Sequence, residues 1–550
     1  MEYTNERAGQ DDVVLEAGSD SIAVDGTRSA RVTHTVVRFP RFDVRPFDLH
    51  ARRTMRIDFG VEATGGTLEA AGTRSSPYTM FVRQFDSAGG PIEADLDRVR
   101  FMAGPDSRRV VLPVVLEPST ATVELALYQA RDQPERVRLF RRRVVLGRTA
   151  YRQEGARLVS SATVTDPGQW TQDGPRVVYR SYWGQSWAEM PPGWALERVH
   201  PNCLMAAEYL LTHNVNRHFL TQDEGARRFY DPPFGPARPK GDAILLSFSA
   251  GQDSTAAAAV LPADVTKVYC RRAYDGSYAA NGAHVTLRKF DAEARALESF
   301  SPLVIVPNTF ELIGIAAGLR FGFRDHFGYG AVCLLLADHF RAGYIASGAP
   351  MEHVFLGAGN RYVDILGNPS SQHNALTRFF AHCGIKLTLP VGFLSEVLTN
   401  AIVNASPYRG IAVSCPNVGQ NGDWCGACVK CFRKLRLDGR PAPPPTDRIR
   451  ASLAARPLKN ASSVVFAAQR AREELPELAE YMDVDLDFLT RYHTTGFHGL
   501  LDERLQHEVG ERLRLFGIDP MSSEDEDKLR RIGQVFVPDT FDPAVAGIKP

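Results

Sequence analysis

The sequence predicts an α/β protein in which a parallel sheet covered by helices lies between an antiparallel β domain and a helical C-terminal region. Three patterns support this fold class. Apolar residues alternate with period two over 31–147, strand-like and helix-like segments alternate over 241–440, and apolar residues recur at helical spacing over 441–550. We expect residues 1–30 to form a loose N-terminal segment and residues 148–240 a mixed connecting region.

The composition excludes several broad classes of protein. The 550 residues carry 64 Lys and Arg against 64 Asp and Glu, which argues against a protein that binds polyanions over its whole surface. Hydrophobic residues make up 44% and charged residues 23%, which is typical of globular chains rather than disordered ones. No apolar run reaches the roughly 18 residues that cross a bilayer, and the first residues lack the apolar core of a signal peptide. We therefore predict a cytoplasmic protein with no membrane partner.

The N-terminal part has the alternation of half-buried strands. Met55, Ile57 and Phe59 would share one face of a strand, and glycine-containing turn signals lie at 64–67 and 88–91. These features predict an antiparallel β domain resembling a sandwich. Residues 136–143 hold five arginines, which predicts either a strand with a solvated basic face or a site for a phosphate-bearing substrate or RNA.

The α/β part is bounded by two proline-rich stretches, 230–239 and 441–445, which we interpret as linkers. Between them the expected strands are 243–247, 265–270, 303–306, 344–347 and 354–356, and the expected helices include 255–261 and 331–341. After them the expected helical segments are 463–482 and 501–515.

The most informative segment follows the first of these strands. A buried apolar strand leads into a turn of small residues, Ser249-Ala-Gly251, and then into a helix that we expect to open at Asp253, Ser254 or Thr255. Small residues let the backbone approach a ligand, and unpaired N–H groups at a helix N-terminus bind anions. Asp253 could cap the helix or help to place a metal ion that bridges phosphates. No Gly-Lys-Ser/Thr ending is present, so the turn differs from that of Ras-type hydrolases.

The stretch Ser249-Ala-Gly-Gln-Asp-Ser254 resembles the Ser-Gly-Gly-x-Asp-Ser signature of the PP-loop ATP pyrophosphatases. This resemblance implies a five-stranded, Rossmann-like sheet of the PP-loop/HUP type that binds ATP and Mg²⁺. It also implies adenylation of a carbonyl or carboxyl oxygen with release of pyrophosphate. The alternative interpretation is a simple strand, turn and helix with a capping residue. The chain departs from the signature at Ala250, whose methyl group we expect to be tolerated only if φ is negative.

A cluster of four cysteines indicates a metal site. Cys415, Cys425, Cys428 and Cys431 lie within seventeen positions on a glycine-rich stretch. Zn²⁺ takes four thiolates tetrahedrally, and an iron–sulfur cluster could use the same ligands. A closed site of four thiolates leaves no open position, so we expect a structural Zn²⁺. Unliganded structural cysteines are the alternative.

The loop and the cysteines together resemble two families. A Gln-Asp-Ser-Thr loop followed by a late Cys-Gly-x-Cys-x-x-Cys is similar to 7-cyano-7-deazaguanine synthase over about residues 241–436. That resemblance implies a structural zinc and conversion of a carboxylate through an amide to a nitrile with ATP and ammonia. The stretch Trp424-Cys-Gly-Ala-Cys-Val-Lys-Cys431, with a β-rich region ahead, resembles the ATP-dependent epimerase of UDP-N-acetylmuramoyl-L-alanyl-L-glutamate. That resemblance implies adenylation of a glutamyl carboxylate to acidify the neighbouring Cα–H.

We therefore predict an adenylating enzyme for a small-molecule or peptide-precursor carboxylate, with ammonia or another amine as the second substrate. The predicted catalytic residues are Asp253, Ser254 and His373, a polar-loop histidine that would be either a general base or merely exposed. The predicted nucleotide-binding residues are Ser247, Ser249, Ala250, Gly251, Gln252, Asp253, Ser254, Thr255 and Arg271. Two alternatives stay open: a protein that modifies tRNA, and a nucleotide-binding module without turnover.

Overall fold

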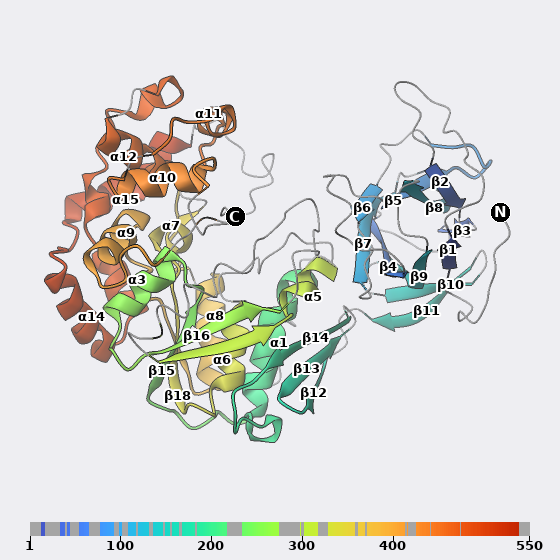
Figure 1. Cartoon of the computed structure of the whole chain (residues 1–550), viewed down its shortest axis with the longest axis horizontal. Coiled ribbons are helices and arrows are strands. Elements are labelled where there is room, and N and C mark those ends of the chain that lie inside the picture. The colour runs from blue at the N-terminus through green and yellow to red at the C-terminus, as the bar shows by residue number, and fades with distance from the viewer. Residues whose placement is uncertain are drawn as a thin grey trace.

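The structure is a computed structural model of the 550-residue chain (Figure 1). It describes residues 13–16, 34–38, 41–44, 54–64, 78–92, 98–101, 108–116, 119–130, 136–146, 149–154, 157–163, 168–181, 184–216, 234–273, 298, 302–316, 328–357, 361–368, 371–412, 415, 425–440, 442–472 and 475–537.

Two antiparallel sheets form the N-terminal part. One has six strands, β1 (Val13–Glu16), β4 (Thr54–Thr64), β7 (Arg108–Val115), β9 (Arg136–Leu146), β10 (Thr149–Glu154) and β11 (Arg157–Thr163). The other has five strands, β2 (His34–Arg38), β3 (Phe42–Asp43), β5 (Tyr78–Phe85), β6 (Arg98–Phe101) and β8 (Thr122–Ala130). Both sheets contribute fully buried apolar residues, Ile57 from β4 and Met80 and Val123 from the second sheet. The six-stranded sheet continues to Thr163, beyond the boundary expected at residue 147.

The second part is built on an eight-stranded sheet with the order β12-β13-β14-β17-β16-β15-β18-β21. Its strands are β12 (Gln169–Asp173), β13 (Arg176–Ser181), β14 (Gly184–Glu189), β15 (Ala243–Phe248), β16 (Thr266–Arg272), β17 (Leu303–Asn308), β18 (Ala342–Ser347) and β21 (Lys386–Thr388). The last five are parallel to one another, and β12–β14 join antiparallel beside β17. Part of the connecting region therefore extends the parallel sheet.

The five parallel strands, numbered along the chain, have the order 3-2-1-4-5 across the sheet, with β15 as strand 1 and β18 as strand 4. The chain moves outward from β15 to β17 and then returns to the other side of β15. Because the connections leave β15 and β18 in opposite directions, the carboxyl ends of these two strands bound the place where ligands bind in open α/β sheets.

Helices cover both faces of this sheet, because successive side chains of each strand point to opposite faces. Ile244 and Leu246 pack in the same buried cluster as α3 (Gln252–Val260) and α9 (Glu396–Ala405), whereas Leu245 packs with α1, α6 and α8. The bounds of those three helices are α1 (Pro201–Asn216), α6 (Gly330–Leu336) and α8 (Gln372–His382).

The C-terminal part is helical, as expected, and gathers beside α3 and α9 (Figure 1). Its elements are α10 (Val429–Leu437), α11 (Asp447–Ala454), α12 (Ala461–Ala471), η5 (Pro476–Tyr481), η6 (Asp487–Thr490), α13 (Thr494–Leu500), α14 (Glu503–Leu515) and α15 (Ser523–Phe536). The segment expected over 463–482 is divided, because α12 ends at Ala471 before Arg472 turns to a φ of 52°. Within the described residues, no helix is long and apolar enough to span a membrane.

One of the expected strands was wrong. Residues 354–356 are not a strand of the parallel sheet, because α7 (Met351–Val354) ends there and the two-residue strand β19 (Leu356–Gly357) pairs only with β20 (Arg361–Tyr362). The fifth parallel strand is β21, whose three residues are too few to show a period. The described end of the first proline-rich stretch, residues 234–239, is irregular, as expected. It is also fixed to the α/β part, because the buried Arg238 places its Nε 2.5 Å from Asp338 Oδ1.

Candidate functional site

The loop between β15 and α3 lies at the reversal of strand order. Residues 249–251 leave the carboxyl end of β15, and α3 begins at Gln252 with Gly251 as its N-cap. The segment after β18 passes so close that a Cβ on Gly348 would lie 2.5 Å from the Cα of Ser254. Only glycine fits this approach, which brings the carboxyl ends of the two strands together.

The expectation about Ala250 was wrong. Its φ is 56°, in the left-handed region, although a non-glycine residue there costs roughly 1 kcal/mol or more. The side chain is fully buried and packs in the cluster of α3 and β15. Tight packing around the methyl group holds this backbone, and strain of this kind recurs at ligand-binding loops.

Two serines tie the loop to the first turn of α3. The hydroxyls of Ser249 and Ser254 lie 3.0 Å apart, and the Ser249 N–H donates to Ser254 Oγ at 3.3 Å. The Ser254 hydroxyl donates to the carbonyl of Gly251 at 3.0 Å. The helix opens slightly earlier than expected, and no side chain caps it. Thr255 Oγ1 is buried without a hydrogen-bond partner in the described part of the chain.

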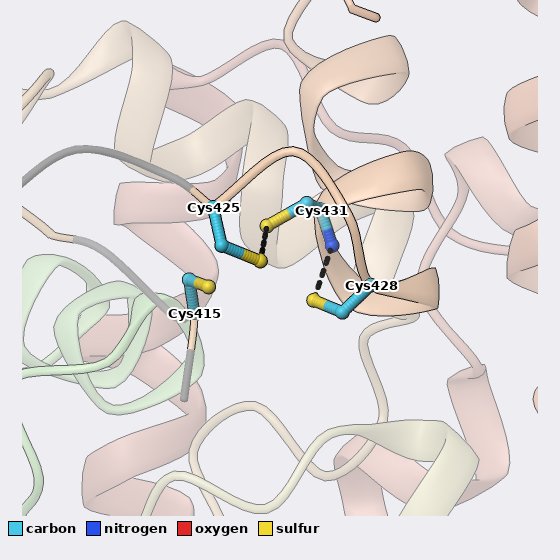
Figure 2. A group of neighbouring side chains, drawn as sticks. All are labelled: Cys415, Cys425, Cys428 and Cys431. Carbon is cyan, nitrogen blue, oxygen red and sulfur yellow. Dashed lines mark hydrogen bonds between the residues drawn. The ribbon is translucent and has the colours of Figure 1, made fainter. Parts of the chain in front are cut away.

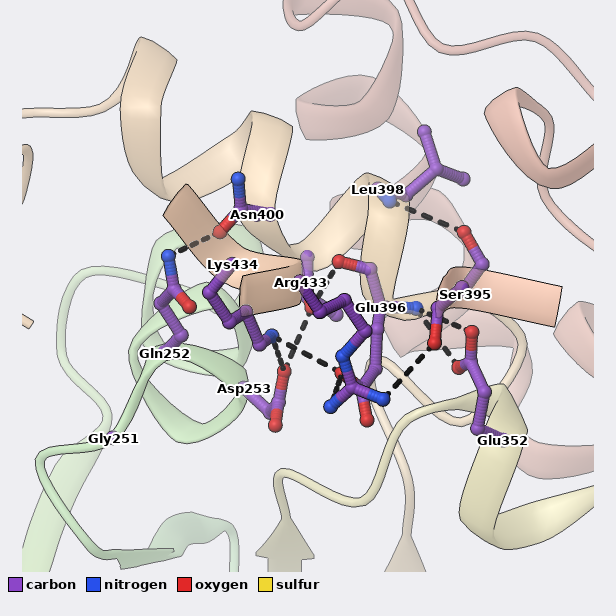
Figure 3. Close-up of polar contacts among 12 residues, drawn as sticks. Gly251, Gln252, Asp253, Glu352, Ser395, Glu396, Leu398, Asn400, Arg433 and Lys434 are labelled. Carbon is purple, nitrogen blue, oxygen red and sulfur yellow. Dashed lines mark hydrogen bonds and ion pairs between the residues drawn. The ribbon is translucent and has the colours of Figure 1, made fainter. Parts of the chain in front are cut away.

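Asp253 does not cap the helix. Its Oδ1 accepts a hydrogen bond from Thr399 Oγ1 at 2.8 Å. The same oxygen lies 3.3 Å from Lys434 Nζ (Figure 3). Burial alone would raise the pKa of Asp253, but the charges of Lys434 and Lys430 and the Thr399 hydrogen bond hold it well below its usual range. Asp253 is therefore a carboxylate that links the loop to α9 and α10.

A second carboxylate, Glu396, shares the same cations. Glu396 Oε2 lies 2.5 Å from Arg433 Nη2 and 3.4 Å from Lys434 Nζ, and all three side chains are buried. Burial would raise the pKa of Glu396, but Arg433 and Lys434 lower it. The Glu396 N–H donates to both carboxylate oxygens of Glu352, at 3.0 and 2.8 Å. Burial, and then the charge of Glu396, raise the pKa of Glu352 to about 8.

Buried amides form a third connection between the loop and α10. Gln252 Nε2 donates to Asn400 Oδ1, and Asn400 Nδ2 donates to Asp438, the C-cap residue of α10. Asn404 Nδ2 also donates to Asp438 Oδ1 at 2.8 Å. The first turn of α3 therefore contacts α10 directly through Lys434 and indirectly through Asn400.

The four cysteines converge as expected (Figure 2). The sulfur atoms of Cys415, Cys425, Cys428 and Cys431 all lie within 4.8 Å of one another. The Cys425 and Cys431 sulfurs are 3.6 Å apart, close to the ~3.8 Å edge of a tetrahedron with 2.3 Å metal–sulfur bonds. The group could hold a metal ion such as Zn²⁺.

The local backbone explains how this short stretch supplies three of the ligands. Gly426 has a φ of 66°, which turns the chain between Cys425 and Cys428. Cys428 is the N-cap of α10, and its sulfur accepts from the Cys431 N–H at 3.4 Å. A hydrogen bond with Cys415 and burial raise the pKa of Cys428 to about 11, and a bound divalent cation would reverse this by stabilising the thiolate.

The structure gathers residues 249–255, the centre of the predicted nucleotide site, in one loop and the first turn of α3. Ser247 lies half-buried in β15, and Arg271 lies exposed at the carboxyl end of β16. His373 is buried near the start of α8, and burial lowers its pKa to about 4. Among the described residues, no hydrogen bond or ion pair joins His373 to residues 249–255. It is not the exposed loop histidine of the alternative interpretation.

Sequence reasoning missed Lys434 and Thr399, which contact Asp253, and Arg433, which pairs with Glu396. Lys434 and Arg433 follow the last cysteine, and Glu396 and Thr399 lie on α9. Arg433 and Lys434 lie two and three positions after the predicted metal ligand Cys431, and this closeness is the sequence signal that could have pointed to them. No local pattern marks the partners from α9, because they meet Asp253 only through the fold.

Comparison with known proteins gives one family match. Residues 375–533, which include α9, α10 and the cysteine cluster, match a family described as one of unknown function (DUF6395). No curated protein matches this chain.

Likenesses to solved structures are weak. The enzymatically active domain of tailspike protein 4 of bacteriophage CBA120 is 11% identical with a TM-score of 0.17, over 25% of this chain and 19% of that one. The CBM22-1 xylan-binding domain of Paenibacillus barcinonensis Xyn10C is 15% identical with a TM-score of 0.16, over 26% of this chain and 88% of that one. A CBM4 structure is 12% identical with a TM-score of 0.15, over 24% and 86%. TM-scores this low do not indicate a shared fold.

Proposed function

We propose that this chain binds ATP at the loop after β15 and adenylates a carboxyl or amide oxygen of a substrate, releasing pyrophosphate. One observation carries the proposal. A lysine-free loop of small residues enters the N-terminus of α3 at the reversal of strand order, and buried cations of α10 lie beside it. A PP-loop type of sheet is part of the proposal, supported by the strand order 3-2-1-4-5 and by the Ser249-Ala-Gly-Gln-Asp-Ser254 stretch.

The chain's own groups fit a triphosphate. The first N–H groups of α3 and the hydroxyls of Ser249 and Ser254 would donate to phosphate oxygens. Thr399 and Lys434 both contact Oδ1 of Asp253, so Oδ2 could hold a Mg²⁺ ion, which would balance the negative charge of the phosphates. Positive charge from α10 would stabilise the charge that develops on the departing pyrophosphate.

The chemistry that follows is acyl or imidoyl transfer. A substrate oxygen forms a bond to the α-phosphorus while the bond from that phosphorus to the β-bridging oxygen breaks, so pyrophosphate leaves. Ammonia or another amine then attacks the activated carbon, and AMP leaves with the former substrate oxygen, giving an amide from a carboxylate. A second cycle on the amide oxygen, followed by loss of AMP and a proton, gives a nitrile. In this proposal a structural Zn²⁺ occupies the four cysteines.

A second candidate is epimerisation of a glutamyl peptide precursor of peptidoglycan after the same adenylation. Two features favour it: an antiparallel β region precedes the α/β part, and Lys430 lies between the last two cysteines in the Trp-Cys-Gly-x-Cys-x-Lys-Cys stretch. Modification of tRNA is a third candidate, motivated by the arginines of β9. The side chains of that strand lie outside what the structure describes, and only its backbone pairing with β4 and β10 is given.

The test is ATP turnover with a panel of carboxylates plus ammonia, UDP-muramoyl dipeptides, and bulk tRNA. The proposal expects one class to stimulate the release of AMP and pyrophosphate together. A carboxylate labelled with ¹⁸O should transfer one label to AMP. Stimulation by a dipeptide, with exchange of the glutamyl Cα–H, favours the epimerase. Stimulation by tRNA favours the third candidate if it is lost in the triple variant Arg141→Ser, Arg142→Ser, Arg143→Ser. ATP binding without any pyrophosphate would leave a binding module.

A further inference from the structure

Helix α10 begins at the cysteine cluster and carries two lysines one turn apart. Cys428 is its N-cap, and Lys430 and Cys431 lie in its first turn. Lys434 lies four residues after Lys430. Residues at this spacing share one face of a helix. Since Lys434 Nζ lies 3.3 Å from Asp253 Oδ1, the shared face is the one toward the nucleotide loop.

Lys430 and Lys434 differ in their burial and in their ionic partners. Lys434 is fully buried and lies between two carboxylates, Asp253 and Glu396. Lys430 is half-buried, and within the described residues no ion pair or hydrogen bond reaches it, although it is close enough for its charge to act on Asp253. Lys434 is therefore already neutralised, whereas Lys430 has no close counter-ion.

The charged side chains around Asp253 also single out Lys430. Three cationic side chains, Lys430, Arg433 and Lys434, lie near two acidic ones, Asp253 and Glu396, and the ion pairs of the described residues use only Arg433 and Lys434. A cation beside a helix N-terminus attracts an anion, and residues 249–254 contain no lysine or arginine of their own.

We propose that Lys430 binds the β- and γ-phosphates of the nucleotide, the pair that departs as pyrophosphate, and that the metal-anchored start of α10 positions it. Lys434 has a different role, because it fixes Asp253 and Glu396 in the absence of ligand. This inference rests on the proposed function, and it adds the residue that recognises the leaving group. The cysteine site thereby becomes part of nucleotide recognition through its helix.

The test measures binding of pyrophosphate, ATP and AMP by calorimetry to the full-length, metal-loaded protein. The variants are Lys430→Met, Lys430→Arg and, as a matched control, Lys459→Met at an exposed lysine before α12. Lys430→Met should weaken pyrophosphate and ATP roughly 10- to 100-fold, the usual effect of losing a charge-assisted hydrogen bond, with little change for AMP. Lys430→Arg should keep most of the affinity, and Lys459→Met all of it.

Metal content and Tm of Lys430→Met should equal those of the wild type, which excludes a merely structural effect. Chelation of the metal should weaken pyrophosphate binding in the wild type but add little in Lys430→Met. Unchanged pyrophosphate affinity in Lys430→Met, with wild-type binding intact, overturns this inference and leaves the proposed function standing. A wild-type protein that binds neither ATP nor pyrophosphate overturns both.

Discussion

Lys434 Nζ lies 3.3 Å from Asp253 Oδ1, and this ion pair connects the helix that begins at the cysteine cluster with the first turn of α3. The lysine is fully buried and also lies 3.4 Å from Glu396 Oε2. Two motifs that are far apart in the sequence, the small-residue loop and the four cysteines, are therefore parts of one structural unit.

Replacing Lys434 with Met should destabilise the protein. The buried carboxylate of Glu396 and the partly buried carboxylate of Asp253 would lose a cation. Breaking a buried ion pair from one side costs about 3–5 kcal/mol. Chemical denaturation of the α/β part would measure the loss. Lys434→Met combined with Asp253→Asn should recover part of it, because the uncompensated charge at Asp253 is then removed as well. A double variant no more stable than Lys434→Met would contradict this account of the pair.

Replacing Ser249 with Ala should impair catalysis without unfolding the protein. Ser249 is exposed at the loop, and its hydroxyl contacts Ser254 Oγ and the Gly251 N–H rather than the core. Loss of one preorganised donor typically lowers turnover about 100-fold. Pyrophosphate release would be compared with that of Ser452→Ala on α11, which should match the wild type. Full activity of Ser249→Ala would remove this residue from the site.

Replacing Cys428 with Ser should lower the metal content and the Tm together, because metal binding contributes directly to folding free energy. Cys333→Ala is a suitable control, since Cys333 is fully buried and belongs to a different buried cluster from the four cysteines. That control should lower the Tm while the metal content stays at the wild-type value. A purified protein without metal, and with the same Tm in Cys428→Ser, would contradict the metal site.

Replacing Glu352 with Gln should change how stability depends on pH. Burial and the charge of Glu396 raise the pKa of Glu352 from 4.5 to about 8 in the folded state. The folded protein therefore holds a proton that the unfolded chain releases, so this contribution is complete below pH 4.5 and disappears as the pH rises through about 8. Glutamine does not titrate, so the decline in Tm between pH 5 and 8.5 should be smaller in Glu352→Gln. Parallel curves for the two proteins would show that Glu352 is already ionised at neutral pH.

The parts of the fold with strong local patterns could be predicted from the sequence. The run at β15 gives a buried strand, and the four cysteines come together because three of them lie within one turn-forming stretch. The antiparallel alternation around Ile57 and Val123 corresponds to buried strand positions. In each case neighbouring residues determine the outcome.

The rest depends on contacts between distant segments. Asp253 and Thr399 are 146 positions apart, and they meet because α9 packs against α3, which no spacing in the sequence reveals. Strand β21 has three residues, so neighbouring β18 and not its own pattern defines it. The positive φ of Ala250 also depends on packing, because local preference alone would favour glycine there.

The most direct measurement is the product analysis of ATP turnover, with AMP, ADP, pyrophosphate and phosphate separated and quantified for the metal-loaded protein and its stimulating substrate. The account predicts AMP and pyrophosphate in equal amounts, with both strongly reduced in Ser249→Ala. Release of ADP and phosphate instead would mean that the γ-phosphate is attacked, and would contradict adenylation at this loop.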